Sequence, residues 1–278
     1  MKYRIISAMV GIAVFIPIIV FSDTLLLPIA AAFFACIAVL ELYRCIGGGR
    51  KLSYLAISLL IAAASPILVG VLRKDFSGFI GILAFEACIF VTLMFSFLVF
   101  RAGKEAFSKV AQMTLGTLYI TVGFTSLVLL RQFENGLYLF LMPFYVAWIT
   151  DSMAYFLGRL FGKHKLCPTI SPKKTVEGAI GGLIFGVGVC VLTAFILEKC
   201  SLLSPNYWFL TVSCLVYSCL SQLGDLFASL IKREYGVKDF GNIMPGHGGV
   251  MDRFDSILFI SPVILMTVGS VLLPEFFF

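Results

Sequence analysis

The chain has 278 residues, 60% of them hydrophobic and only 13% charged, with a mean hydropathy of +1.03. Soluble domains are about 45–50% apolar and about 25% charged, so this composition excludes an ordinary soluble globule, and the 28 phenylalanines exclude a disordered chain. The net charge is +6, and in so apolar a chain basic residues indicate membrane topology before they indicate nucleic acid. We therefore expect a protein embedded in a bilayer, with no nucleic-acid partner.

Nine apolar segments are long enough to cross a bilayer, which takes about 20 residues of helix. The first resembles a signal peptide, but residues 19–22 offer no small-x-small cleavage site and a second span follows at once, so we expect a retained anchor. We expect an all-α fold, a polytopic transmembrane helical bundle of about nine spans. In chain order they lie at about 5–22, 25–43, 54–72, 77–100, 110–130, 137–158, 176–197, 207–231 and 254–273.

The basic residues are distributed unevenly between the two sides of these spans. With the N-terminus in the cytoplasm, only four of the 21 Lys and Arg residues lie outside, namely Arg73, Lys74, Arg131 and Lys199. This positive-inside bias predicts a cytoplasmic N-terminus in a multi-pass protein of the cell (inner) membrane. The two longest polar segments, 159–175 and 232–254, then face the cytoplasm, so we expect the active site at the cytoplasmic leaflet.

The two halves of the chain differ in character. Residues 1–136 form about five mostly featureless spans, whereas residues 137–278 form a catalytic region of about four spans with two cytoplasmic loops and most of the intramembrane polar groups. Two acids in the first half are isolated. We interpret Glu41, near the end of its span, as snorkelling to the interface, and leave Glu86 open between a helix-packing hydrogen bond and a functional role.

A polar stripe runs along the eighth span at spacings of three and four residues, which places it on one face of an otherwise apolar helix. Ser and Gln can join helices by hydrogen bonds, but that alternative accounts poorly for Asp225, about two turns below the interface. We therefore predict that the stripe lines a wet cavity. Its residues are Ser218, Ser221, Gln222, Asp225, Ser229 and Lys232.

Two further carboxylates, Asp252 and Asp255, share the first turn of the ninth span. Capping of that helix would account for them alone, but together with Asp225 they would surround one pocket with hard oxygen ligands, which suit Mg²⁺. The preceding glycines at 246, 248 and 249 let main-chain N–H groups approach an anion. The sequence thus predicts a metal and phosphate site.

The sixth and seventh spans supply a second group of polar residues around a basic loop. Asp151 and Tyr155 lie near the cytoplasmic end of the sixth span, and Thr175 is placed to cap the seventh. Positive-inside bias alone would account for the lysines of the loop, but they also lie where a lipid phosphate or a nucleotide triphosphate would arrive. Close helix packing is predicted by a small-residue face of three glycines, Gly178, Gly182 and Gly186.

Acids for a divalent metal, several cations, a glycine-rich turn and a lipid-facing cavity together indicate phosphoryl or nucleotidyl transfer to a membrane lipid. The sequence contains neither a Walker A motif nor G-x-G-x-x-G. The segment from Ser229 to Asp255, with Lys232-Arg233, Lys238-Asp239, Pro245-Gly246-His247-Gly248-Gly249 and Asp252-Arg253, resembles the C-terminal signature of the phosphatidate cytidylyltransferases (CDP-diacylglycerol synthases). Three further matches lie upstream: Gln222, Gly224 and Asp225; Asp151 to Tyr155; and Ser171 to Thr175.

The resemblance implies the reaction CTP + phosphatidate → CDP-diacylglycerol + pyrophosphate, in phospholipid biosynthesis and assisted by Mg²⁺, alone or with a second cation. It also implies membrane-lipid contact and a homodimer. The metal ligands implied are Asp225, Asp252, Asp255 and Asp151, and the catalytic residues are Asp225, Asp252, Lys232, Arg233, Lys238, Arg253 and His247. The substrate-binding residues implied are Lys173, Lys174, Ser171, Gly248, Gly249, Asp239, Gln222, Ser229 and Tyr155.

Two other functions remain as alternatives. A CTP-dependent lipid kinase would need a base for a hydroxyl nucleophile and would release CDP rather than pyrophosphate. A transporter would use midplane carboxylates as an ion site, but here the polar groups crowd one leaflet and no matching broken helix is evident in the first half.

Overall fold

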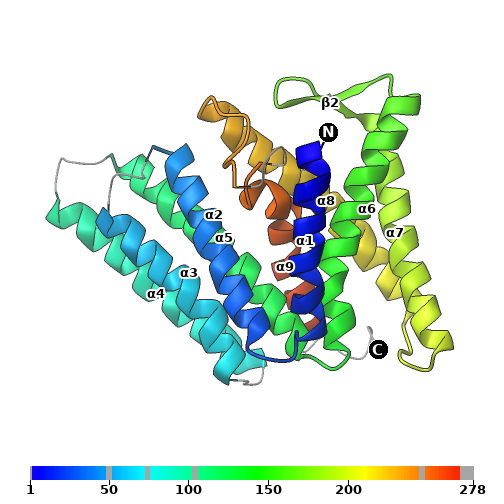
Figure 1. Cartoon of the computed structure of the whole chain (residues 1–278), viewed down its shortest axis with the longest axis horizontal. Helices are drawn as coiled ribbons and strands as arrows, with labels where there is room; N and C mark the ends of the chain where they lie inside the picture. Colours follow the sequence, from blue (N-terminus) through cyan, green and yellow to red (C-terminus); the bar gives the residue numbers. More distant parts are fainter. Residues whose placement is uncertain (1, 48–51, 73–75, 102–105, 244–247, 270–278) are drawn as a thin grey trace. The chain divides into compact units, whose positions relative to one another are not determined.

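The structure is a computed structural model and describes residues 2–47, 52–72, 76–101, 106–243 and 248–269. It is predominantly helical, in agreement with the predicted class, and the helices in chain order are α1 (Lys2–Val20), α2 (Leu26–Cys45), α3 (Leu52–Leu72), α4 (Phe76–Phe100), α5 (Phe107–Gln132), α6 (Gly136–Phe161), α7 (Val176–Lys199), α8 (Tyr207–Glu234) and α9 (Met251–Gly269) (Figure 1). A helix lies at each of the predicted spans.

Seven of the helices in the described part of the chain, α2 to α8, are long and apolar enough to cross a membrane, which makes this a multi-pass membrane protein. The predicted count of nine spans is not confirmed. The fully described apolar part of α1 covers only Met9–Val20, and α9 carries three charges in its first five residues.

A two-stranded antiparallel hairpin departs from the predicted purely helical fold. Strand β1 (Lys165–Cys167) pairs with β2 (Ser171–Thr175), with Lys165 opposite Thr175, where the sequence predicted only a basic loop. The hairpin connects α6 to α7 and brings a lysine-rich strand next to the start of α7.

The chain forms two compact units. The first comprises Met1–Gln132 with Glu234–Phe254, and the second comprises Phe133–Arg233 with Asp255–Phe278. The segment between α8 and α9 therefore belongs with the N-terminal helices, although the predicted catalytic region had included it.

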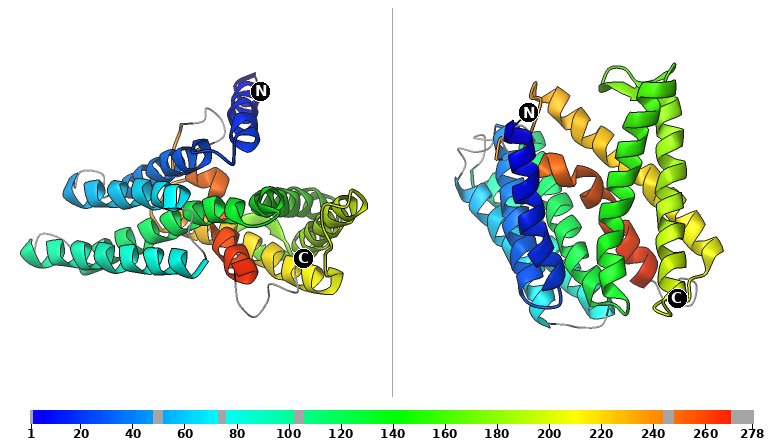
Figure 2. Two further views of the ribbon diagram at one scale, coloured as in Figure 1. Left: turned by 90° about the horizontal axis from the view of Figure 1, so that it is seen from below. Right: turned by 45° about the vertical axis from the view of Figure 1, so that its right-hand side comes forward.

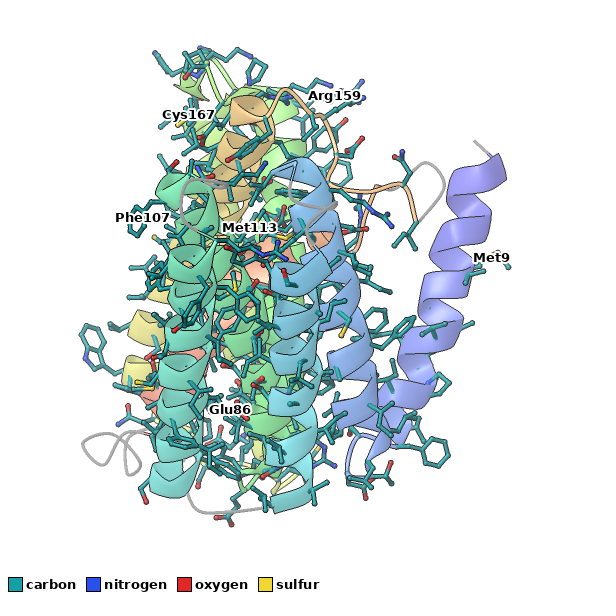
Figure 3. All side chains as sticks on the ribbon, turned by 90° about the vertical axis from the view of Figure 1, so that its left-hand side faces the viewer. Met9, Glu86, Phe107, Met113, Arg159 and Cys167 are labelled. Carbon is teal, nitrogen blue, oxygen red and sulfur yellow. The ribbon has the colours of Figure 1, made fainter. Side chains whose placement is uncertain are left out.

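In the first unit, α2 packs against α3 and α5, and α5 also packs against α3 and α4. Polar side chains connect these helices: the buried hydroxyls of Tyr43 and Ser58 are 2.6 Å apart, and Ser65 donates to the half-buried Glu86 carboxylate. Figure 3 labels Glu86 on α4. Glu86 thus makes the helix-packing hydrogen bond that was one of its two predicted roles.

In the second unit, α6 and α7 run side by side, as Figures 1 and 2 show. The predicted glycine face of α7 makes this contact: a Cβ at Gly182 would lie 2.6 Å from the Thr150 carbonyl oxygen, and Cβ atoms at Gly178 and Gly186 would overlap α6 atoms. Thr175 caps α7 as predicted, because its hydroxyl accepts from the Gly178 N–H at 3.2 Å.

Helix α8 has the reverse polarity of a helix in a soluble protein. Its serines Ser218 and Ser221 are completely buried, whereas Leu223, Phe227 and Leu230 are exposed. An apolar outer surface around buried polar groups is what a hydrocarbon solvent requires. The fold therefore directs the polar stripe of α8 inward.

Candidate functional site

Three carboxylates from three helices come together in the second unit. Asp151 lies on α6, Asp225 on α8 and Asp255 on α9. Asp225 interacts electrostatically with each of the other two, and Asp151 also interacts with Asp255. We call these three residues the acid cluster. The structure brings together three of the four acids that the sequence suggested as metal ligands, and their role as one functional site stays a prediction.

A lysine from the hairpin closes on this cluster. The Lys174 ammonium lies 2.6 Å from Asp225 Oδ2 and donates to the Gln222 carbonyl oxygen at 3.4 Å. Lys174 is the fourth residue of β2, and the following residue begins the cap of α7, so the hairpin fixes where this side chain starts. Lys174 and Asp225 are 21% and 30% exposed, so water screens their attraction only in part.

A second lysine comes from α8 itself. Lys232 is buried and interacts electrostatically with Asp255, two helical turns after Asp225. Burial of a lysine requires compensating charge, which the cluster supplies. The three carboxylates of the acid cluster are therefore accompanied by two ammonium groups, those of Lys174 and Lys232.

Hydrogen bonds fix the orientation of the surrounding side chains. Ser256 donates from Oγ to Asp151 Oδ2 at 3.2 Å, and its main-chain N–H donates to Asp255 Oδ1 at 2.8 Å. Gln222 is buried and donates to the Ala179 carbonyl oxygen at 3.0 Å, which joins α8 to α7. Ser256 was not among the predicted site residues, although its place beside Asp255 was the available signal.

The deeper part of the α8 stripe is polar and completely buried in the described structure. The hydroxyl oxygens of Ser218 and Ser221 are buried without a hydrogen-bond partner among the described residues. Buried hydroxyls of this kind are normally satisfied by ordered water. The predicted wet cavity stays a prediction that these two groups favour.

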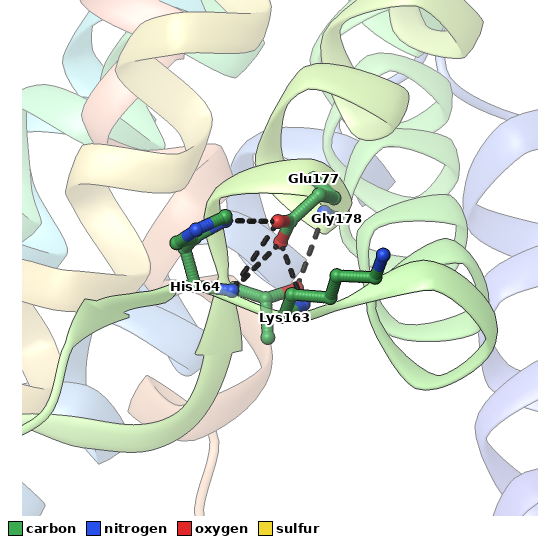
Figure 4. Close-up of polar contacts among 5 residues, drawn as sticks. Lys163, His164, Glu177 and Gly178 are labelled. Carbon is green, nitrogen blue, oxygen red and sulfur yellow. Dashed lines mark hydrogen bonds and ion pairs between the residues drawn. The ribbon is translucent and has the colours of Figure 1, made fainter.

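The base of the hairpin is held by Glu177, in the first turn of α7. Figure 4 shows its carboxylate facing His164 and the main-chain amides before β1. His164 Nδ1 lies 2.6 Å from Glu177 Oε1, and the N–H groups of Lys163 and His164 donate to the same carboxylate at 3.1 to 3.3 Å. Arg233 Nε reaches the Ile170 carbonyl oxygen at 3.4 Å from α8. These bonds fix the strand that carries Lys174.

The glycine-rich loop, residues 235–250 between α8 and α9, belongs to the first unit, and the structure describes its residues 235–243 and 248–250. Asp252 Oδ2 accepts from the Phe240 N–H at 2.8 Å and from the Gly249 N–H at 3.0 Å. Gly248 has a φ of +87°, a conformation that favours glycine. The Gly249 N–H, predicted to bind a substrate anion, is thus used inside the loop.

The remaining predicted residues lie at or near the surface. Exposed side chains are those of Tyr155, Lys173, Arg233, Lys238, Asp239 and Arg253, while Ser171 and Ser229 are half-buried. His247 lies outside the described residues. The Tyr155 ring packs edge-on against Phe156.

One structural residue was misread from the sequence. Glu41 does not snorkel to the interface: it is completely buried and accepts the N–H groups of Val250 and Met251 at the start of α9. Its position near a helix end suggested the interface, and its partners, more than two hundred residues away, gave no local signal.

The acid cluster has the chemistry of a magnesium site without a preformed coordination shell. Across the described ranges, no group of three or more His, Cys, Asp or Glu side chains is arranged to hold a metal ion. Mg²⁺ usually binds through one or two carboxylates, several waters and substrate phosphates, so it does not require such a group. The oxygen donors of Asp225, Asp151 and Asp255 fit this mode of binding.

Comparisons with known proteins agree along almost the whole chain. A model described as "Cytidylyltransferase family" matches residues 2–271. The phosphatidate cytidylyltransferase of Staphylococcus haemolyticus is 34% identical over 265 residues, which cover 95% of this chain and 97% of that protein. The phosphatidate cytidylyltransferases of Staphylococcus saprophyticus and Staphylococcus aureus are 36% and 34% identical over the same shares of both chains.

Proposed function

The chain belongs to the cytidylyltransferase family, and on this premise we propose that it is the enzyme that transfers the CMP moiety of CTP to phosphatidate, giving CDP-diacylglycerol and pyrophosphate. The observation that carries the proposal is the acid cluster with its two lysines, inside a bundle of apolar helices. In such a site the lysines can neutralise the phosphates of a lipid and a nucleotide, and the carboxylates can hold a metal ion.

The proposed metal is Mg²⁺, alone or with a second cation, held by Asp225 with Asp151 and Asp255. When bound, the ion neutralises charge on the reacting phosphates and on the leaving pyrophosphate. Asp252 is proposed as a further ligand because it lies one helical turn before Asp255 on α9. Lys174 now balances Asp225, and we expect it to turn to a substrate phosphate when the metal takes that place.

The basic residues around the acid cluster and on the glycine-rich loop are proposed to bind phosphates. Lys232, buried beside Asp255, is fixed in place and suits the transferred phosphoryl group. Flexible exposed side chains suit the outer phosphates and the lipid headgroup: Lys173, Arg233, Lys238 and Arg253. Proposed supporting contacts to the substrates come from Ser171, Gln222, Ser229, Tyr155, Asp239 and Gly248, and His247 is proposed to order the loop or bind phosphate.

The nucleophile proposed is a phosphate oxygen of phosphatidate. It is already ionised at neutral pH, so the chain need not supply a general base. What its residues must supply is orientation and charge neutralisation of two anions, the task for which the lysines and arginines are suited. A lipid kinase, in contrast, would have to deprotonate a hydroxyl group.

Topology and assembly complete the proposal. We propose nine membrane passages, with α1 and α9 joining the seven longer helices, a cytoplasmic N-terminus in the cell (inner) membrane, and a homodimer. The uneven distribution of basic residues supports the orientation. Cysteine substitutions at the N-terminus and in the 199–206 turn, labelled with an impermeant thiol reagent on a cysteine-free background, test it: only the turn should react from outside.

The decisive experiment is turnover of radiolabelled CTP by the purified protein in detergent with phosphatidate, with and without Mg²⁺. We expect labelled CDP-diacylglycerol and stoichiometric pyrophosphate only when both phosphatidate and Mg²⁺ are present. Release of CDP, with a phosphorylated lipid as the product, would replace the proposal by a lipid kinase. No CTP turnover, together with ion flux in proteoliposomes, would replace it by a transporter.

A further inference from the structure

Glu41, near the end of α2, is a completely buried carboxylate that lies outside the acid cluster. Burying an ionisable side chain within a membrane-spanning helix is costly unless it is paired or hydrogen-bonded. Arg44, one turn later, attracts it electrostatically, while Asp252 repels it. Its direct partners must therefore account for much of its stability in this position.

Those partners are main-chain amides at the end of the glycine-rich loop. The Val250 N–H donates to Glu41 Oε1 at 3.1 Å, and the N–H of Met251, the first residue of α9, donates to Oε2 at 2.9 Å. The first N–H groups of a helix have no acceptor within it, and they carry the positive end of its dipole. Both carboxylate oxygens of Glu41 thus cap α9 from a different helix.

Two glycines of the loop lie directly against the same carboxylate. A Cβ at Gly249 would overlap both Glu41 oxygens, and a Cβ at Gly241 would overlap Oε1. The first part of the loop, at Gly241, and its last part, at Gly249, therefore both lie against the Glu41 carboxylate. Asp252 connects the same two sides through the Phe240 and Gly249 amides, so four loop and helix amides are bound by two carboxylates.

We propose that Glu41 is a positioning residue for the reaction: it holds the glycine-rich loop and the first turn of α9 so that Asp252 and Gly248 keep their places. Glu41 reaches no substrate in this role and acts through the backbone it binds. The inference rests on the proposed function, in which Asp252 contacts the metal and Gly248 the substrate. It gives a membrane-embedded acid of the N-terminal region a part in the chemistry.

Hydrogen exchange tests the positioning without any substrate. We expect Glu41→Gln to speed exchange of the Val250 and Met251 amides at least about tenfold, because a Gln side chain offers one acceptor oxygen where two are used. Glu86→Gln is the matched control, an acid in another helix of the same unit whose partner is the Ser65 hydroxyl. It should leave those amides unchanged, and wild-type exchange in Glu41→Gln would overturn the proposal.

A second variant reaches the same contact from the other side. Gly249→Ala places a methyl group against Glu41, and Gly81→Ala is its control because a Cβ there meets nothing within 4 Å. We expect Gly249→Ala to reproduce the faster exchange, including in the event that Glu41→Gln does not purify folded. Normal exchange in a folded Gly249→Ala protein would refute the contact.

Kinetics separates positioning from a loss of folded protein. We expect Glu41→Gln to lower kcat/KM for CTP by about 100-fold and to raise the Mg²⁺ concentration for half-maximal activity about tenfold, because small displacements of a reacting group have effects of this size. A smaller folded fraction lowers the maximal rate alone, and that result would refute the positioning role. If the wild type makes no CDP-diacylglycerol, the proposed function fails, while hydrogen exchange still decides whether Glu41 holds the loop.

Discussion

Replacing Lys174 by Gln tests the charge balance of the acid cluster. Its ion pair with Asp225 is 2.6 Å long, and the two side chains are between a fifth and a third exposed. The pair is therefore intermediate between two classes. Surface pairs contribute under about 1 kcal/mol, and disruption of a buried pair costs about 3–5 kcal/mol. The variant leaves three mutually repelling carboxylates with Lys232. We therefore expect a loss of about 2 kcal/mol, which lowers the midpoint of thermal unfolding by roughly 4–8 °C in magnesium-free detergent buffer.

Magnesium should restore most of this loss if it binds at Asp225. At ten times its Kd, an ion that binds only the folded protein contributes about 1.4 kcal/mol, which should raise the midpoint of Lys174→Gln by several degrees. At the same Mg²⁺ concentration the wild type should rise less, because there the ion must first displace Lys174 from Asp225. Lys199→Gln is the control, because this exposed lysine at the far end of α7 lies over the Phe195 ring. An equal response to Mg²⁺ in Lys174→Gln and the wild type would refute placement of the metal at Asp225. If the midpoint of Lys174→Gln without Mg²⁺ equals that of the wild type, the ion pair is not important for stability.

Three further predictions test separate parts of the structure. Asp225→Asn and Asp252→Asn should each abolish CTP turnover while the protein inserts and purifies normally; retained turnover in either would remove that residue from the metal site. Gly182→Val should destabilise the α6–α7 contact by about 1–3 kcal/mol in thermal unfolding, whereas Gly188→Ala, on an open face of α7, should be neutral. Thr175→Val should cost about 1 kcal/mol through loss of the α7 cap, and Thr175→Ser should retain that stability.

The acid cluster could be predicted because its signal is local. Asp151 and Asp225 interrupt apolar helices, and such charges turn inward because the hydrocarbon outside cannot solvate them. Acids that point inward from neighbouring helices at similar depth are then expected to lie close together. The hydrogen bonds of Asp252 could not be predicted in the same way. Its carboxylate accepts from main-chain N–H groups of the loop, and their position depends on the path of the chain before α9.

The hairpin was missed because its strands carry no strand pattern. Ser171–Thr175 contains a proline and two lysines and lacks the alternating apolar residues that identify a half-buried strand. Its pairing is three to five residues long, and the Glu177 carboxylate fixes its base by accepting the Lys163 and His164 amides. Contacts of this kind, between a helix start and the chain that precedes it, leave no signal in the residue pattern of the strands themselves.

Three intramembrane acids show why a sequence predicts that a charge within a membrane helix has a partner but not what the partner does. Glu86 meets the Ser65 hydroxyl, which joins two helices; Glu41 meets main-chain amides, which fixes a loop; Asp225 meets the Lys174 ammonium. Of these three partners, only the last is a charged side chain that a metal ion or a phosphate can replace. Exchangeability of the partner, rather than burial of the acid, therefore separates a reactive site from a structural one, and it is the property that the magnesium response of Lys174→Gln measures.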